Sequence, residues 1–163
     1  MRFCFEHTVP VSSEKVFGFF ENPQRLEVLH AGWSSIRLLH HESQVRVGVE
    51  TWMEAPIWGI PVVLGFRHML FEPPVRFGEE AIHGPFSRFM HIHEFIAHDG
   101  NTVVRDVLEI CLPLHYGGQA AMRHVVAPIV RRMFHNRAEA LVRLARNGSL
   151  AKGAGRLVRP TTV

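Results

Sequence analysis

Hydrophobic and polar residues alternate along most of the first two-thirds of the chain. Residues 2–9 place Phe3, Phe5 and His7 on one face, which is the period of a β-strand. Further strands are predicted over residues 34–39, 45–55, 62–71, 76–82, 86–97 and 102–112. The segment Asp99-Gly100-Asn101 is a hairpin signal between the last two. The pattern therefore predicts about seven strands.

Three segments have the three- and four-residue spacing of a helix instead. A short helix begins near Ser12 or Ser13, whose hydroxyl can accept an N–H of the first turn. A second short helix runs from Pro23 to about residue 29. A long helix is predicted over residues 119–146, with a kink at the interior Pro128. Its apolar positions are Met122, Val125, Val126, Ile129, Val130, Met133, Ala140, Leu141 and Leu144.

The order of these elements is strand, two short helices, six strands and one long helix, which predicts an α+β fold. The long helix must bury its apolar stripe, and the concave face of the sheet is the only large surface available to it. We expect one domain over residues 1–146. Residues 147–163 lack apolar periodicity and are rich in basic residues, so a disordered basic tail is predicted there.

Composition indicates the number of domains and the cellular compartment more clearly than it indicates the function. A chain of 163 residues fits one domain that needs no disulfide, and Cys4 and Cys111 are expected to stay reduced. No run of eighteen apolar residues and no signal-peptide core occurs, so we expect a cytoplasmic protein without stable membrane insertion. The net charge of +3, without interleaved aromatic residues, does not favour a nucleic-acid partner. A homodimer is left open.

Several short motifs together resemble those of a known superfamily. One is FEPPVRF at residues 71–77, and another is GPF at residues 84–86 with the aromatic and histidine alternation that follows. The remaining matches are Pro10, Val16, Phe17, Phe20, Thr102, Asp106, Pro113, Phe134, Arg137 and Leu141. Over roughly residues 1–146 the chain resembles the SRPBCC superfamily, which includes START, birch-pollen-allergen-like and polyketide cyclase proteins. Phe89 stands where those proteins usually have Trp, and an aromatic residue is missing near Ile110.

The resemblance implies a helix-grip fold, in which a curved antiparallel sheet of about seven strands wraps around the long C-terminal helix. It also implies an internal cavity for a small hydrophobic ligand, such as a lipid, a polyketide or an aromatic metabolite. No cofactor is implied. The residues expected to line the cavity are Phe66, His68, Phe89, His91, His93, Phe95, Leu108, Met122, Val126, Ile129 and Met133. Trp58, in an apolar loop, is a candidate for the rim of the cavity.

His91, His93 and Asp106 are the candidate catalytic residues. The two histidines share one strand face, and His93 and Asp106 lie at nearly equal distances from Gly100 in the hairpin turn. They are therefore expected to be cross-strand neighbours. A carboxylate next to an imidazole fixes its tautomer and raises its basicity, which suits a general base. A purely structural buried pair has the same requirements.

Three functions remain open at this point. The first is a binding module for a hydrophobic molecule, and the second is a cyclase- or dehydratase-type enzyme that uses the His–Asp pair. The third is a regulatory domain that interacts through the basic helix and tail. A zinc site would need a third ligand beside His91 and His93, for which His68 is the best candidate. The spacing alone does not support such a site, and no metal is predicted.

Overall fold

Seven strands and a segmented C-terminal helix make up the computed structural model, which describes residues 1–31, 34–41, 45–57 and 59–150. The strands are β1 (Arg2–Val9), β2 (Arg37–His41), β3 (Glu50–Ile57), β4 (Ile60–Glu72), β5 (Arg76–His83), β6 (Arg88–His98) and β7 (Asn101–Cys111). The helices are α1 (Ser13–Phe20), α2 (Arg25–His30), α3 (Gly118–Ala121) and α4 (Ala127–Arg146). A 3₁₀ turn (Leu114–Tyr116) precedes α3, and a π-helical turn (Met122–Val126) joins α3 to α4.

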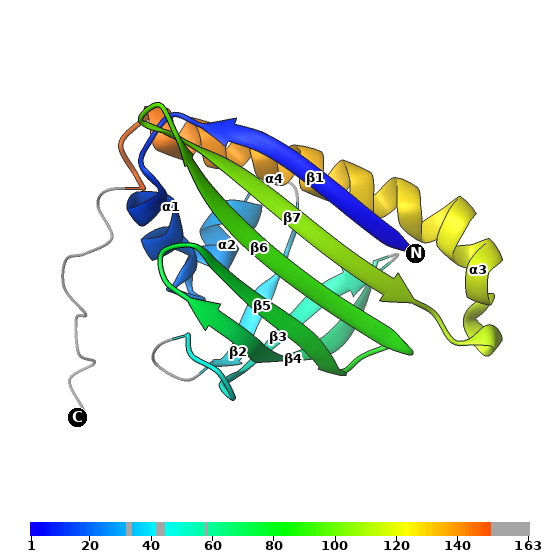
Figure 1. Ribbon diagram of the computed structural model, residues 1–163. Helices are drawn as coiled ribbons and strands as arrows, with labels where there is room; N and C mark the ends of the chain where they lie inside the picture. Colours follow the sequence, from blue (N-terminus) through cyan, green and yellow to red (C-terminus); the bar gives the residue numbers. More distant parts are fainter. Residues whose placement is uncertain (32–33, 42–44, 58, 151–163) are drawn as a thin grey trace, which may run out of the picture.

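The strands form one antiparallel sheet in the order β1-β7-β6-β5-β4-β3-β2. β2 to β7 therefore form a meander, and β1 pairs with β7 at the other edge. Figure 1 shows α4 running lengthwise along the sheet beside β1, with α1 and α2 near one end of it. This is the predicted α+β helix-grip architecture, and the prediction is confirmed.

The first part of the predicted strand over residues 45–55 is a turn. Gly48 has a φ of 90°, which favours glycine because it has no Cβ. Its N–H donates to the carbonyl of His68, and the N–H of His68 donates to Val49. β3 therefore begins only at Glu50, and it continues through Pro56 because the φ of proline suits extended backbone.

Pro128 affects the long helix through the π-helical turn just before it. The N–H of Ala127 donates to the carbonyl of Met122, five residues back. The turn thus contains one residue more than an α-helical turn, which changes the direction of the side chains that follow. For this reason the predicted stripe is wrong at Ile129, which is 47% exposed. The buried face of α4 follows Val130, Phe134, Arg137 and Leu141 instead.

Two buried clusters occupy the space between the sheet and α4. The first gathers around α1 and the C-terminal half of α4, and includes Phe17, Phe95 and Leu141. The second lies toward the start of α4, and includes Leu108 and Phe134. A third, smaller cluster consists of Met53, Leu64 and Phe66 with the half-buried side chains around them.

The folded domain extends beyond the predicted boundary at residue 146. Leu150 is buried in the first cluster, and the carbonyl of Ser149 accepts a hydrogen bond from Arg25 at 3.4 Å. Residues 147–150 therefore belong to the domain. The rest of the predicted tail, residues 151–163, lies outside the described residues, as does Trp58.

Buried His30, at the end of α2, should make stability depend on pH. Burial lowers its pKa from 6.5 to about 4, although a hydrogen bond to the carbonyl of Leu26 opposes this effect. Between these pH values the unfolded chain binds a proton that the folded chain does not. The free energy of unfolding should therefore fall as the pH drops from 6.5 to 4, by about 3 kcal/mol from this group.

A His30→Gln variant should lack this contribution. Urea unfolding of both proteins at pH 7.5 and pH 4 measures it, as the extra loss of stability in the wild type. His98→Gln is the matched control, since His98 is exposed at the end of β6, and the pH profile of this variant should follow that of the wild type. Parallel profiles for the wild type and His30→Gln would contradict the prediction.

Candidate functional site

Asp106 on β7 is the centre of a buried polar cluster. It is directly opposite His93 in the β6–β7 register, so the predicted cross-strand pairing is confirmed. Its Oδ1 atom lies 2.7 Å from Nδ1 of His93 and 3.1 Å from Nε2 of His91. Nη2 of Arg137 is 3.3 Å from the same oxygen. The carboxylate, which is wholly buried, thus connects two strands and α4.

Arg137 was not predicted as a site residue, although it belongs to the motif that the C-terminal helix shares with the SRPBCC pattern. Its guanidinium carbon lies 5.0 Å from the ring centre of Phe20 and 5.3 Å from that of Phe134. Its position three residues after Phe134 and four before Leu141 is the available signal, because a cation on an apolar helix face needs a buried partner. Asp106 is that partner.

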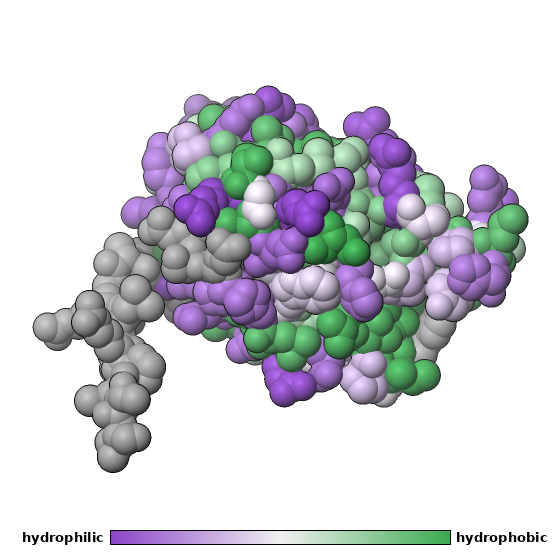
Figure 2. Space-filling view, turned by 90° about the horizontal axis from the view of Figure 1, so that it is seen from below, coloured by the Kyte–Doolittle hydropathy of each residue, from purple (hydrophilic) through white to green (hydrophobic). Residues whose placement is uncertain are grey.

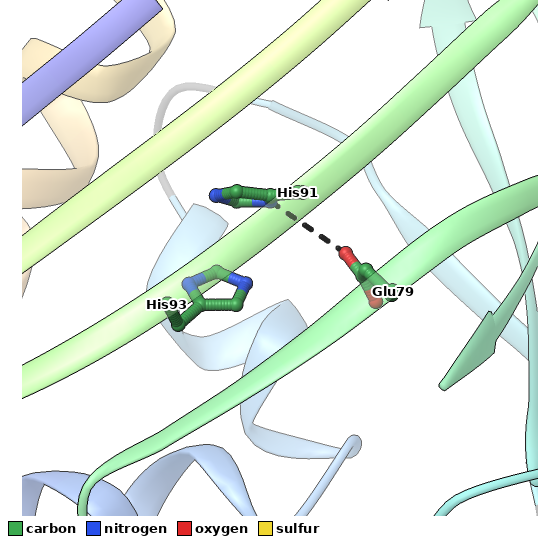
Figure 3. Close-up of side chains that lie close together, drawn as sticks. All are labelled: Glu79, His91 and His93. Carbon is green, nitrogen blue, oxygen red and sulfur yellow. Dashed lines mark ion pairs between the residues drawn. The ribbon is translucent and has the colours of Figure 1, made fainter. Parts of the chain in front are cut away.

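Glu79 on β5 is the second carboxylate of the cluster. It is opposite His91 on one side and His68 on the other. Its Oε1 atom lies 3.7 Å from Nδ1 of His91, and Figure 3 shows the two side chains pointing toward each other, with His93 beside them. The sequence has Glu79 and Glu80 in succession, so it does not reveal which of them faces inward without the sheet register.

The charges in the cluster shift one another's proton affinities. Burial would raise the pKa of Asp106, but Arg137 and the hydrogen bonds from both histidines hold it well below its usual range. Glu79 behaves similarly, since contacts to His91 and the other histidines outweigh burial and lower its pKa to about 2. Both carboxylates are therefore ionised at neutral pH.

The two histidines respond in opposite directions. Burial and the neighbouring His91 lower the pKa of His93 to about 3. For His91, burial acts the same way, but hydrogen bonds to Asp106 and Glu79 outweigh it and raise the pKa. His93 is thus a neutral imidazole at neutral pH, whereas His91 holds a proton more readily than a free histidine. A pair with separated pKa values is typical of acid–base sites.

Aromatic rings surround this cluster. The ring centre of Phe77 lies 4.3 Å from that of His93, and Phe134 meets His91 edge-on at 5.4 Å. Phe20 lies 5.6 Å from His93 on a further side. The cluster separates the first and second buried clusters, and its apolar surroundings strengthen each charge interaction within it.

Several buried polar atoms have no hydrogen-bond partner among the described residues. They include Oδ2 of Asp106, Nε of Arg137 and Nδ1 of His68. Nε2 of His68 lies 3.4 Å from the hydroxyl of Thr51. Buried polar atoms in native proteins are normally paired with protein or water. These atoms are therefore available to a bound polar group.

The residues predicted to line the ligand cavity are placed as follows. Ile129 does not face the interior, for the reason given above. Half-buried positions are occupied by Phe89, Val126 and Met133. The buried residues are Phe66, His68, His91, His93, Phe95, Leu108 and Met122. They are divided among the three apolar clusters and the polar cluster, so the interior has apolar walls on either side of a polar centre.

Two surface hollows of the described chain lie away from this interior. One follows the outer face of α4 between His135 and Asn147, and the other lies between α2 and β2. The face in Figure 2 has hydrophobic side chains gathered along one edge, with hydrophilic side chains among and above them.

Comparisons with known proteins support the fold. No protein-family model matches the chain, and no curated protein matches its sequence. Among solved structures, the Zhui aromatase/cyclase from Streptomyces sp. R1128 has a TM-score of 0.73 at 11% identity and covers 96% of this chain and 99% of its own. Protein TTHA0849 from Thermus thermophilus has a TM-score of 0.72 at 16% identity, over 91% of this chain and 99% of its own.

Ara h 8.0201 is a third similar structure, with a TM-score of 0.67 at 13% identity, over 90% of this chain and 98% of its own. These are SRPBCC-type helix-grip proteins, so the predicted resemblance is confirmed for the fold. None of the described helices is long and apolar enough to span a membrane.

Proposed function

We propose that the chain binds a small, mainly apolar molecule with one polar group between the sheet and α4. The observation that carries this proposal is the set of unpaired polar atoms in an otherwise apolar interior, above all Oδ2 of Asp106 and Nε of Arg137. An unpaired buried polar atom costs about 1–3 kcal/mol. A ligand that supplies the missing hydrogen bonds recovers part of that cost and is oriented by it.

The two unpaired atoms define the chemistry of the ligand. Oδ2 of Asp106 can only accept a hydrogen bond at neutral pH, and Nε of Arg137 can only donate one. A hydroxyl group can meet either requirement, because it both donates and accepts. The rings of Phe20, Phe77 and Phe134 provide aromatic surface around it. A hydroxylated aromatic or polyketide-like molecule fits this environment better than a plain hydrocarbon chain.

Paired probes test this proposal directly. Displacement of a hydrophobic dye and native mass spectrometry should show that 2-naphthol binds the metal-free chain at least about tenfold more tightly than naphthalene, a difference of about 1.4 kcal/mol. Phe77→Leu should weaken binding, and Ile129→Ala should leave it unchanged because Ile129 faces solvent. Absence of binding, or equal affinity for the two probes, would contradict the proposal.

A second candidate function is general acid–base catalysis, of the cyclase or dehydratase type. His93 is the base: it is a neutral imidazole, and its Nδ1 donates to Asp106, so Nε2 can accept a proton. His91, whose pKa is raised, is the proton donor. The Zhui aromatase/cyclase has a similar fold, and this fold accommodates many different functions. Exchange of the α-protons of 2-tetralone in D₂O should be faster with the wild type than with His93→Gln. Equal rates would remove the candidate.

A further inference from the structure

Three side chains of metal-ligating type converge at the middle of the sheet. Glu79 on β5 and His91 and His93 on β6 each have one ligand atom within 4.8 Å of the others. Cross-strand pairing places Glu79 opposite His91, and the period of the strand places His93 next on the same face. Figure 3 shows the carboxylate beside both imidazole rings.

The hydrogen bonds of Asp106 determine which nitrogen atoms are free. Its Oδ1 atom accepts from Nε2 of His91 and from Nδ1 of His93. Nη2 of Arg137 is 3.0 Å from the same Nδ1. Because a guanidinium only donates, Nδ1 would have to be unprotonated to accept from Arg137, so it cannot serve both partners at once. The shorter contact, 2.7 Å to Asp106, assigns the proton to Nδ1. Each histidine therefore donates one N–H to Asp106. The nitrogen atoms left to bind a metal are Nδ1 of His91 and Nε2 of His93.

This arrangement is the usual one around a protein-bound metal. A ligating histidine normally donates its other N–H to a carboxylate, which fixes the tautomer and the direction of the ring. Here one carboxylate does this for both histidines, and Arg137 holds that carboxylate in turn. Two imidazoles and one carboxylate form a known zinc ligand set with a free fourth position.

We propose that Glu79, His91 and His93 bind one divalent transition-metal ion of the zinc type, with Asp106 as the carboxylate that orients both histidines. Ligand atoms about 2.1 Å from a tetrahedral ion lie about 3.4 Å apart. Oε1 of Glu79 and Nδ1 of His91 are already 3.7 Å apart, and all three ligand atoms lie within 4.8 Å, so an inward closure of about 1 Å or less is sufficient. The ion replaces the proton on Nδ1 of His91, which is released. Glu79 takes the place of His68, which the sequence favoured as third ligand. The site stands independently of the proposed organic ligand.

Direct titration of the full, metal-free chain tests the site. Zn²⁺ should bind in a ratio of one ion per chain by calorimetry, and Co²⁺ should give the visible absorption of a four- or five-coordinate ion. Glu79→Gln should weaken binding at least about 100-fold, because loss of a direct ligand costs no less than the 10–100-fold typical of an outer-shell partner. Glu80→Gln is the matched control, because the adjacent Glu80 is exposed, and its affinity should remain within about threefold of the wild type.

One further readout keeps the test decisive. In the wild type, Zn²⁺ should shift the imidazole NMR signals of His91 and His93 and leave those of exposed His98 unchanged, which requires no variant to fold. Absence of stoichiometric binding, equal loss in Glu79→Gln and Glu80→Gln, or shifts confined to exposed histidines would overturn the proposal. No organic probe is present in these titrations, so their outcome is separate from that of the naphthol experiment.

Discussion

Asp106→Asn is expected to lower the free energy of unfolding by about 3–5 kcal/mol at pH 7. Asparagine keeps the shape of the side chain and removes its charge. The variant leaves Arg137 buried without its carboxylate partner, at a position where little water reaches the guanidinium. It also weakens the hydrogen bonds that His91 and His93 share, because a neutral amide oxygen is a poorer acceptor than a carboxylate. Urea denaturation followed by circular dichroism measures the loss.

Asp99→Asn is the matched control for this substitution. Asp99 lies in the exposed β6–β7 turn with a φ of 47°, a conformation that asparagine also tolerates. Its stability should remain within about 0.5 kcal/mol of the wild type. A loss below about 1 kcal/mol in Asp106→Asn would show that the cluster is well solvated and would contradict the buried arrangement.

Arg137→Met should cause a loss of similar size, about 3–5 kcal/mol, for the complementary reason. Methionine retains the apolar contacts that the arginine stem makes beside Phe20 and Phe134. The charge is lost, and Asp106 is left buried with only the histidines around it. Arg131→Met, on the exposed side of the same helix, is the control and should change stability by no more than about 0.5 kcal/mol.

The double variant of Asp106→Asn and Arg137→Met distinguishes a charge effect from a packing effect. Each single variant leaves the other partner's charge uncompensated, whereas the double variant removes both. Its loss should therefore be smaller than the sum of the two single losses by at least about 1 kcal/mol. Additive losses would mean that the two side chains contribute through packing with their separate neighbours.

The free-energy cost of burying these charged groups indicates that they serve a purpose other than stability. Two carboxylates, a guanidinium and two imidazoles occupy the place where apolar side chains would join the first and second buried clusters. Replacement of a buried ion pair by apolar residues is often neutral or stabilising, so stability alone does not account for these groups. Both proposals give them a task, as the polar end of a ligand site or as a metal site.

Local sequence patterns were sufficient for the β6–β7 hairpin and one half of the site. Alternation placed His91 and His93 on one strand face, and their distance from the turn at Gly100 predicted that His93 and Asp106 are cross-strand neighbours, which the register confirms. That this face is the buried one is shown by the structure. These contacts are close in sequence, so the period of the strand and the turn type determine them. The order of elements and the family motifs likewise predicted the helix-grip fold.

Contacts between segments distant in sequence determined the other half of the site, which consists of Glu79 and Arg137. Glu79 enters the site because β5 aligns with β4 and β6 in a register that includes bulges in its pairing with β4, and the sequence does not specify those bulges. Arg137 already lies on the apolar face of the C-terminal helix in the sequence, four residues before Leu141, but it meets Asp106 only because α4 packs that face against the sheet. The sequence alone therefore determined which strands and helices form and which faces of β6 and β7 are apolar. Only the tertiary structure decided which charges meet, because that depends on the register of the strands and the rotation of the helix.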